Sequence, residues 1–354
     1  MGSNDQILVA DSSASTGLAW KSYGSQFVAG KNKIINGDFG VWQRGTSFSV
    51  NNASVYTSDR WYIGGSNTLT ISQQAFTPGT APGGGYEAQY FARVNRTARP
   101  TIYDDYFLQR IEDVRTFAGQ TVTLSFWAKT NSGTTTLSGA YIEQWFGSGG
   151  SSSVYVNTSG ALTLTTSWQR FTTTMTMPSI AGKTIGASSF VAVNFAMANS
   201  VGTSAVYDIW GVQLEAGSVA TPFTTATGTI QGELAACQRY YYRVTATQLY
   251  SDFASGYNPS SSEGSYLVPF PVEMRTTPTA LEQTGAPSNY NVLHSSGGTA
   301  ARATCNSVPT FQQASKMAAR VYFLVPGGSL TAGQGSVGGS SNNTVAYLGW
   351  SAEL

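Results

Sequence analysis

The stretch YDIWGVQLEAG, residues 207–217, decides the fold of this chain. It is typical of the closing strand of a β-sandwich. A second stretch, TVTLSFWAK at 121–129, alternates with the period of two that a half-buried strand imposes. The face that we expect in the core carries Val122, Leu124, Phe126 and Ala128. The face that we expect on a partly polar outer surface carries Thr123, Ser125, Trp127 and Lys129.

Other segments in the N-terminal part of the chain predict short strands separated by turns rich in glycine and serine. Residues 147–151, with the sequence GSGGS, are one such turn. Many short strands with regular turns indicate a jelly-roll or related sandwich, which we place at 31–225. The predicted strands lie at 33–46, 59–63, 140–146, 167–178, 190–196 and 206–215.

Two segments flank this sandwich. Residues 1–30 predict a tether whose apolar Leu18 and Trp20 cannot be buried by the segment alone. Residues 226–242 predict a short helix that bridges two domains. The helical interpretation rests on one stripe at helical spacing, formed by Ile230, Leu234, Cys237 and Tyr241.

The C-terminal part, residues 243–354, predicts a second β-sandwich. Pro269 and Pro271 fall in one of its strands and indicate an edge strand or a bulge, because proline cannot donate to a sheet ladder. The predicted fold is therefore all-β: a jelly-roll sandwich, a short linking helix and a second sandwich.

The composition excludes several classes of function. Charged residues make up 10% of the 354 residues, against about 25% in typical soluble domains. The net charge of +1 leaves no electrostatic footprint for nucleic acid or for an anionic membrane. No apolar run approaches the roughly 20 residues that span a bilayer, and the N-terminus shows no signal-peptide pattern. We expect Cys237 and Cys305 to be two buried thiols.

The sequence offers little for catalysis. His294 is the only histidine, so a Ser-His-Asp triad would have one candidate base and no recognisable nucleophile motif. Two adjacent carboxylate pairs remain, Asp104 with Asp105 and Glu112 with Asp113. Neighbouring strand residues point to opposite faces, whereas glycoside hydrolysis needs two carboxyls about 5–10 Å apart. We therefore assign no catalytic residue, although two copies of the chain in an oligomer could each supply one acid.

Sugar binding suits the composition better, because protein–glycan contacts use aromatic faces surrounded by amides and hydroxyls. The chain has 8 Trp, 19 Tyr and 17 Phe. Trp127, Tyr141 and Trp145 are candidates for a platform on an outer sheet surface. The alternative, which the pattern favours, is that these rings pack against a neighbouring subunit or a covering loop.

A second group of candidate sugar-binding residues is Tyr250, Phe253 and Tyr257. They lie in a stretch rich in glycine, serine, asparagine and proline, and recognition often resides in loops that a rigid scaffold positions. The alternative is an ordinary surface loop that contains aromatic residues.

The segment 207–217 is followed by TPF at 221–223 and by CQRYY at 237–241. This order closely resembles bacteriophage tail fibre and receptor-binding proteins, as does PVEMRTTP at 271–278. The resemblance implies a non-catalytic tail fibre of the virion, assembled in the host cytoplasm, that binds bacterial surface polysaccharide. It also implies a homotrimeric fibre attached through its N-terminus to other tail or capsid proteins, without nucleic acid or membrane insertion. Two alternatives stay open: a head fibre or capsid decoration protein, and a capsule-degrading depolymerase.

The predicted jelly roll also resembles carbohydrate-binding modules, many of which hold a structural calcium ion. The positions that match their ligands are Asp38 and Asp208, near Asn36. Gly40 stands where those modules usually have an acid. Calcium prefers six to eight oxygen ligands with several carboxylates, so this departure leaves the implied site incomplete.

Overall fold

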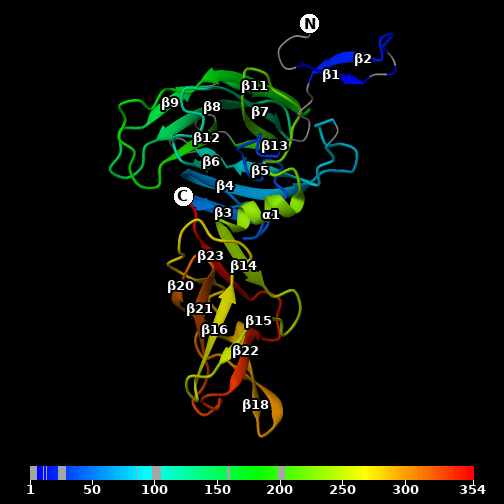
Figure 1. Ribbon diagram of the computed structural model, residues 1–354. Helices are drawn as coiled ribbons and strands as arrows, with labels where there is room; N and C mark the ends of the chain where they lie inside the picture. The colour runs from blue at the N-terminus through cyan, green and yellow to red at the C-terminus, as the bar shows by residue number, and fades with distance from the viewer. Residues whose placement is uncertain are drawn as a thin grey trace.

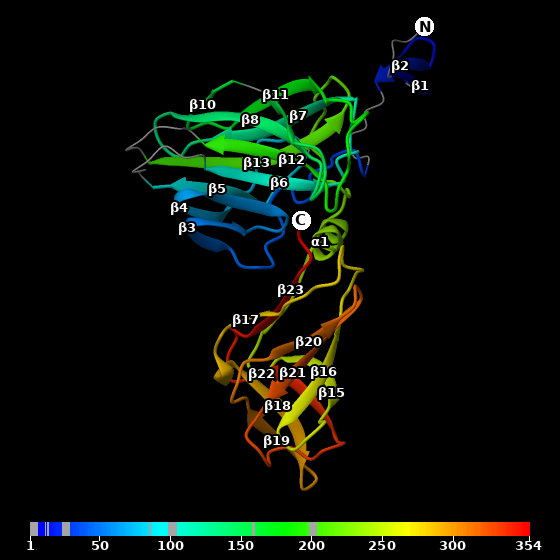
Figure 2. The ribbon, with the colours of Figure 1, turned by 90° about the vertical axis from the view of Figure 1, so that its left-hand side faces the viewer.

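The computed structural model describes residues 6–10, 12, 14–22, 29–84, 86–97, 105–157, 160–197 and 204–354. Figures 1 and 2 show a broad β-sandwich and a narrower β domain, with the helix α1 (Ile230–Gln238) between them. An antiparallel hairpin of β1 (Gln6–Ala10) and β2 (Leu18–Ser22) stands apart at the far side of the sandwich. Nearly all regular structure is β-strand, as the sequence predicts. None of the described residues forms a helix that is long and apolar enough to cross a membrane.

The sandwich is built from antiparallel strands: β3 (Ser47–Tyr56), β4 (Trp61–Ala75), β5 (Tyr90–Arg96), β6 (Tyr106–Glu112), β7 (Thr121–Lys129), β8 (Thr135–Trp145), β9 (Val154–Asn157), β10 (Leu162–Leu164), β11 (Gln169–Thr176), β12 (Phe190–Met197) and β13 (Ala205–Ala216). Their order is β10-β8-β12-β6-β4-β5-β13-β7-β11, with β3 beside β4 and β9 beside β8. The strand β4 passes from one layer to the other, because residues 61–64 pair with β6 and residues 69–75 pair with β5.

One layer runs from β10 to β6 and the other runs from β5 to β11, with β4 joining them. The core lies between these two layers. The ring of Phe126 on β7 lies 4.8 Å from the ring of Phe195 on β12, so the two strands face each other. Val122, Leu124, Phe126 and Ala128 are all buried, which confirms the face that the alternation of 121–129 predicts. β13 breaks its pairing with β7 between Trp210 and Gln213. Gly211 in this bulge has a φ of 64°, a left-handed conformation that favours glycine.

The predicted opening strand at 33–46 is wrong, because these residues form turns and irregular backbone. The side-chain amides of two asparagines take over the bonding that a ladder would supply. Asn32 Nδ2 donates to the carbonyls of Val212 and Thr224 at 3.1 and 3.0 Å. Asn36 Nδ2 donates to two more backbone carbonyls, at 2.9 and 3.0 Å.

The predicted helix is present but shorter, and its predicted apolar stripe is wrong. Ile230 is 58% exposed and Leu234 is 39% exposed, whereas Glu233 and Cys237 are buried. The Glu233 carboxylate accepts the backbone N–H groups of Asn36 and Thr227, each at 2.7 Å. Burial raises the pKa of Glu233. A polar clamp therefore anchors the helix to the sandwich in place of an apolar stripe.

The C-terminal domain has a three-stranded and a seven-stranded antiparallel sheet around its own core. The smaller sheet has the order β14-β23-β17, with β14 (Tyr241–Thr245), β17 (Glu282–Gln283) and β23 (Tyr347–Ser351). The larger sheet, in the order β19-β18-β22-β15-β16-β21-β20, contains β15 (Asp252–Tyr257), β16 (Glu263–Pro269), β18 (Tyr290–Ser296), β19 (Thr299–Thr304), β20 (Thr310–Ala314), β21 (Ala318–Leu324) and β22 (Gly335–Ser340). A short 3-10 helix, η1 (Pro287–Asn289), precedes β18.

The expected edge position for the proline-containing strand is wrong. β16 lies between β15 and β21, ends at Pro269, and leaves Pro271 outside the sheet. The missing N–H falls at the end of the strand, where the ladder stops, so an interior position costs little. Cys237 and Cys305 are both buried and free, as expected.

The C-terminal residues return to the sandwich and join the two domains. The guanidinium of Arg60, 1% exposed, forms an ion pair with Glu353 and lies 3.3 Å from the ring centre of Tyr240. Arg275 donates two hydrogen bonds of 2.7 Å to backbone carbonyls of the same C-terminal segment. Breaking a buried ion pair by removing one partner costs about 3–5 kcal/mol, so this joint is firmly held.

Candidate functional site

The layer β9-β8-β12-β6-β4 presents one outer face that is rich in aromatic and polar side chains. Ile142 points into the core, so the residues that alternate with it on β8, Tyr141, Glu143 and Trp145, point outward. In register with these three on β12 lie Asn194, Ala192 and Phe190. We call this surface the β8 face; it comprises Tyr62, Arg110, Tyr141, Glu143, Trp145, Tyr155 and Phe190.

The rings of the β8 face occur in pairs. Trp145 stacks at a tilt on Phe190 with 4.8 Å between ring centres, and Tyr141 meets the edge of Tyr155 at 6.0 Å. Tyr155 is 60% exposed, and Tyr141 and Trp145 are half-buried. Each pair therefore fixes the position of its rings while part of the aromatic surface stays accessible.

Charged groups lie between and beside the ring pairs. Glu143 accepts hydrogen bonds from the Tyr155 hydroxyl at 3.2 Å and from Ser153 Oγ at 3.0 Å. Partial burial and the neighbouring Glu143 charge raise the pKa of Tyr155. The Arg110 guanidinium lies between two rings, 4.8 Å from Tyr62 and 4.9 Å from Phe190. The face thus combines ring surfaces with fixed hydrogen-bonding groups, which is the chemistry that sugars require.

Sequence reasoning found Tyr141 and Trp145 but missed Tyr155, Phe190 and Arg110. Each of these lies on a strand with a visible alternation, but the alternation of one strand does not reveal its neighbours. The order β9-β8-β12-β6 brings together residues that are far apart in the sequence. The order of the strands in the sheet was the information that the single sequence did not contain.

The carboxylates do not form a hydrolytic pair on this face. Glu112 is also on it, opposite Phe190, but it is bound to Arg239 at 3.1 Å. Glu143 lies two strands away and two residues further along the register, offsets of about 9.5 Å and about 6.6 Å that place the two backbone positions about 12 Å apart. Asp105 is fully buried. Asp104 lies outside the described residues, so the pair Asp104–Asp105 stays an untested alternative.

The outer face of the other layer, around β7, is covered. We call it the β7 face; its buried rings are Phe76, Phe91, Trp210 and Phe223, with Tyr86, Trp127 and Trp168 partly buried against them. Most of the cover comes from outside the strands, from Phe76, Ala81, Tyr86, Ala88 and Phe223. The structure therefore separates Trp127 from Tyr141 and Trp145, and packs it against this cluster of buried rings.

The two carboxylates predicted for calcium have other partners. Both oxygens of Asp208 accept hydrogen bonds from Arg93, at 2.7 and 2.8 Å. Asp38 accepts a hydrogen bond of 2.6 Å from the Tyr86 hydroxyl, and burial raises its pKa. Within the described ranges no three His, Cys, Asp or Glu residues gather as a metal site would require. These residues do not fit a calcium ion.

The three candidates of the C-terminal domain do not form one site. Phe253 packs toward the core, with its ring 6.5 Å from Tyr290. Tyr257, 48% exposed, ends β15. Tyr250 precedes the same strand and lines a hollow of about 500 Å³ at the opposite end.

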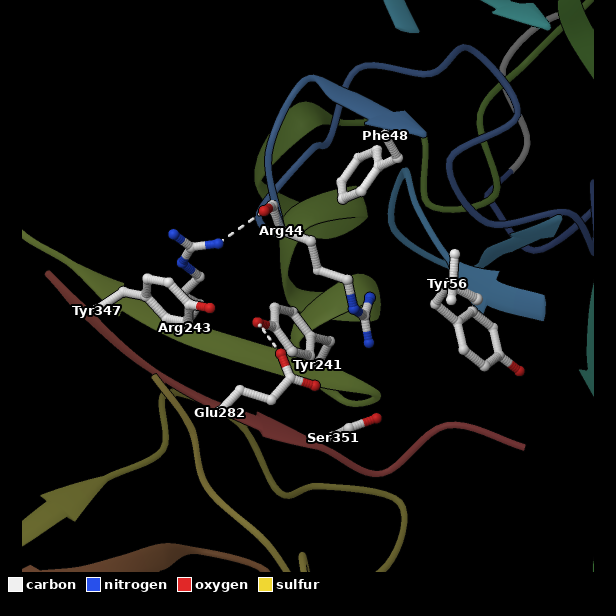
Figure 3. A pocket seen from close by; sticks show the side chains of 9 residues that line it. Arg44, Phe48, Tyr56, Tyr241, Arg243, Glu282, Tyr347 and Ser351 are labelled. Atoms are coloured by element: carbon white, nitrogen blue, oxygen red, sulfur yellow. Dashed lines mark hydrogen bonds between the residues drawn. The ribbon is translucent and has the colours of Figure 1, made fainter. Parts of the chain in front are cut away.

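A further cavity, of about 390 Å³, lies between the two domains (Figure 3). Arg44 lies 3.5 Å from the ring centre of Tyr241, and Arg243 lies 3.5 Å from that of Tyr347. Arg243 also donates to the carbonyl of Arg44 at 2.7 Å, and the Tyr241 hydroxyl donates to Glu282 at 2.8 Å. Because Arg44 of the sandwich contacts both Tyr241 and Arg243 of the C-terminal domain, we interpret the cavity as part of the joint.

The sequence matches no protein-family model and no curated protein. A solved structure that is similar is the CBM22-1 xylan-binding domain from Paenibacillus barcinonensis Xyn10C, with 13% identity and a TM-score of 0.32 over 54% of this chain and 98% of that chain. The CBM22-1–CBM22-2 tandem domain of the same protein has 12% identity and a TM-score of 0.31 over 88% of this chain and 98% of that chain. The enzymatically active domain of bacteriophage CBA120 tailspike protein 4 has 20% identity and a TM-score of 0.32 over 53% of this chain and 22% of that chain.

Proposed function

We propose that this chain is a non-catalytic fibre subunit that binds glycan on the β8 face of its sandwich. The observation that carries the proposal is the placement of Tyr141 and Trp145 on one face of β8, with Glu143 between them. Four residues of strand separate the two rings by about 13 Å. Two ring surfaces at that spacing would stack on two sugars of one polysaccharide chain, and the Glu143 carboxylate would accept hydrogen bonds from their hydroxyls.

The test is binding of the full chain to polysaccharide from bacterial surfaces. The binding is measured as retardation of the chain in a gel that contains the polysaccharide. We expect the double variant Tyr141→Ala/Trp145→Ala to lose most of the retardation. The matched control is Tyr257→Ala, which removes an exposed tyrosine of the other domain. Unchanged retardation of the double variant would contradict a site on the β8 face.

We further propose that the chain works as a homotrimer in the virion, as a phage tail fibre attached through its N-terminal segment and assembled in the host cytoplasm. The resemblance of its sequence to phage fibres supports this, as does the β1–β2 hairpin. A lone two-stranded hairpin is at best marginally stable in water, yet Leu8, Leu18 and Trp20 are each about half exposed on it. Sister chains would cover these side chains, and three copies would add avidity to weak sugar sites.

Light scattering of the purified chain tests the trimer, and a monomer at micromolar concentration would contradict it. A head fibre or capsid decoration protein would have the same fold, so imaging the N-terminus in a virion distinguishes these locations. New reducing ends after incubation with capsule would instead favour a depolymerase.

A further inference from the structure

A hollow of about 500 Å³ opens on the side of the C-terminal domain, away from the joint with the sandwich. Four segments form it: the edge hairpin β18–β19, the short helix η1 before it, the loop that leads into β15 at Tyr250, and the loop that follows β22. Asn291 lies opposite Thr304 on the hairpin, and Arg302 is two residues from Thr304, so all three share its outer face. We call this hollow the asparagine pocket.

The wall of the asparagine pocket is fixed before any ligand arrives. Asn343 Nδ2 donates to the carbonyl of Asn289 at 3.0 Å, and Asn343 Oδ1 accepts the N–H groups of Val345 and Ala346 at 3.1 and 3.0 Å. The backbone N–H of Tyr250 donates to the carbonyl of Ser341 at 3.0 Å. These contacts hold the loop after β22 in place without using the other polar side chains of the pocket.

Tyr250 has a strained backbone in this wall. Its φ of 57° is uncommon for a residue with a side chain, and such strain persists only where surrounding contacts impose it. The conformation places an aromatic ring, 42% exposed, at the rim of the pocket. A ring held in this way needs no reorganisation before it stacks on a sugar.

Arg302 gives the pocket a positive charge without a counter-ion. Its guanidinium lies 4.7 Å from the ring centre of Tyr250 and donates to Asn291 Oδ1 at 3.0 Å. Asn291 is 2% exposed, so it fixes the guanidinium from below. No carboxylate of the described residues forms an ion pair with Arg302, in contrast to Arg60, Arg93 or Arg239, which each have one.

Several neutral groups of the pocket are free to bind a ligand. The side chains of Ser288, Thr304 and Asn342 are exposed and make no hydrogen bond within the part of the chain that the structure describes. Hydroxyl and amide groups of this kind can both donate to and accept from sugar hydroxyls.

We propose that the asparagine pocket binds a sugar residue that carries an anionic substituent, a carboxylate, sulfate or phosphate. The anion takes the position of the missing counter-ion at Arg302, since charge-assisted hydrogen bonds to guanidinium are strong and geometrically specific. The ring stacks on Tyr250, and its hydroxyls contact Asn342 and Thr304. This site lies in a different domain from the β8 face and does not depend on it.

The test is calorimetric titration of the full chain with pairs of saccharides that differ in charge. One arm compares oligogalacturonate with its methyl ester, which removes only the charge; two others compare sulfated and phosphorylated oligosaccharides with their neutral parents. We expect at least one anionic form to bind about tenfold or more tighter than its neutral counterpart, with weakening as salt rises. Equal affinity within every pair, or no binding in all three, overturns the proposal.

Two exposed substitutions assign the binding to the pocket. Arg302→Gln should weaken the anionic ligand about tenfold to a hundredfold and leave the neutral one unchanged; Arg115→Gln, which removes an exposed charge of the sandwich, is the control. Tyr250→Ala should weaken both forms, with Tyr257→Ala as the control. Trp145→Ala should leave this binding intact, so failure of the β8 site and failure of the pocket are distinguishable. Unchanged anion binding by Arg302→Gln would overturn the assignment.

Discussion

The two outer faces of the sandwich carry similar sets of aromatic rings but differ in what lies above them. On the β7 face, Trp210 is fully buried beneath Phe76 and Phe223, which come from segments outside the strands. On the β8 face, Trp145 has one ring partner, Phe190, and stays half-buried. The strand pattern is the same in both layers. The segments outside the strands therefore decide whether a ring is buried in the fold or stays accessible.

Removing the largest ring of the covered face tests the stabilising half of this comparison. We expect Trp210→Ala to lower the free energy of unfolding by about 3–5 kcal/mol, because it leaves a cavity among buried rings. Urea unfolding measures the loss, and Tyr257→Ala, an exposed aromatic, is the control. A loss below about 1 kcal/mol would show that the cover does not pack against Trp210.

A matched pair of tryptophans tests the contrast directly. Trp145→Ala should weaken polysaccharide binding about three- to tenfold, the value of one aromatic contact, with little change in stability. Trp127→Ala should lower stability and leave the affinity unchanged, because its ring packs under the cover. Affinity comes from gel retardation and stability from urea unfolding. The opposite assignment of the two effects would reverse the roles of the faces.

A change of pH tests the edge of the covered β7 face, where Asp38 accepts a hydrogen bond from the Tyr86 hydroxyl. Burial raises the pKa of Asp38 in the folded chain above its ordinary value of 3.8. The folded state therefore binds this proton more tightly than the unfolded state, so the contribution of Asp38 to stability is present at acid pH and is lost as pH rises through the folded pKa. Relative to Asp38→Asn, the natural chain should gain stability from pH 7 to about pH 4. Urea unfolding at both pH values checks this; a constant difference would contradict it.

The smallest expected effect concerns calcium. Arg93 donates hydrogen bonds to both oxygens of Asp208 on the β7 face, so neither oxygen is available as a ligand for an ion. We expect the unfolding temperature to be the same with calcium and with a chelator. A rise of several degrees with calcium, lost in Asp208→Asn, would mean that an ion displaces Arg93.

The sequence predicted what depends on one segment and missed what depends on pairing. The core residues of 121–129 are correct because a strand's alternation is local. Trp127 and Trp145 could not be distinguished, because the rings that pack with Trp127, among them Phe76 and Phe223, lie far from it in the sequence. The helix stripe failed because Glu233 binds the N–H of Asn36, almost two hundred residues away in the chain. In the asparagine pocket, Tyr250 was visible as a candidate, but Arg302 became relevant only once the fold brought it over that ring.

The joint around Arg60 has a consequence for how a polymer is recognised. With Glu353 and Tyr240 packed against this guanidinium, the two surfaces that we propose for sugar binding are held at a set separation. A long polysaccharide can engage both only if its repeat unit is commensurate with that spacing. The chain would then select polymers by the length of their repeat as well as by the chemistry of each sugar.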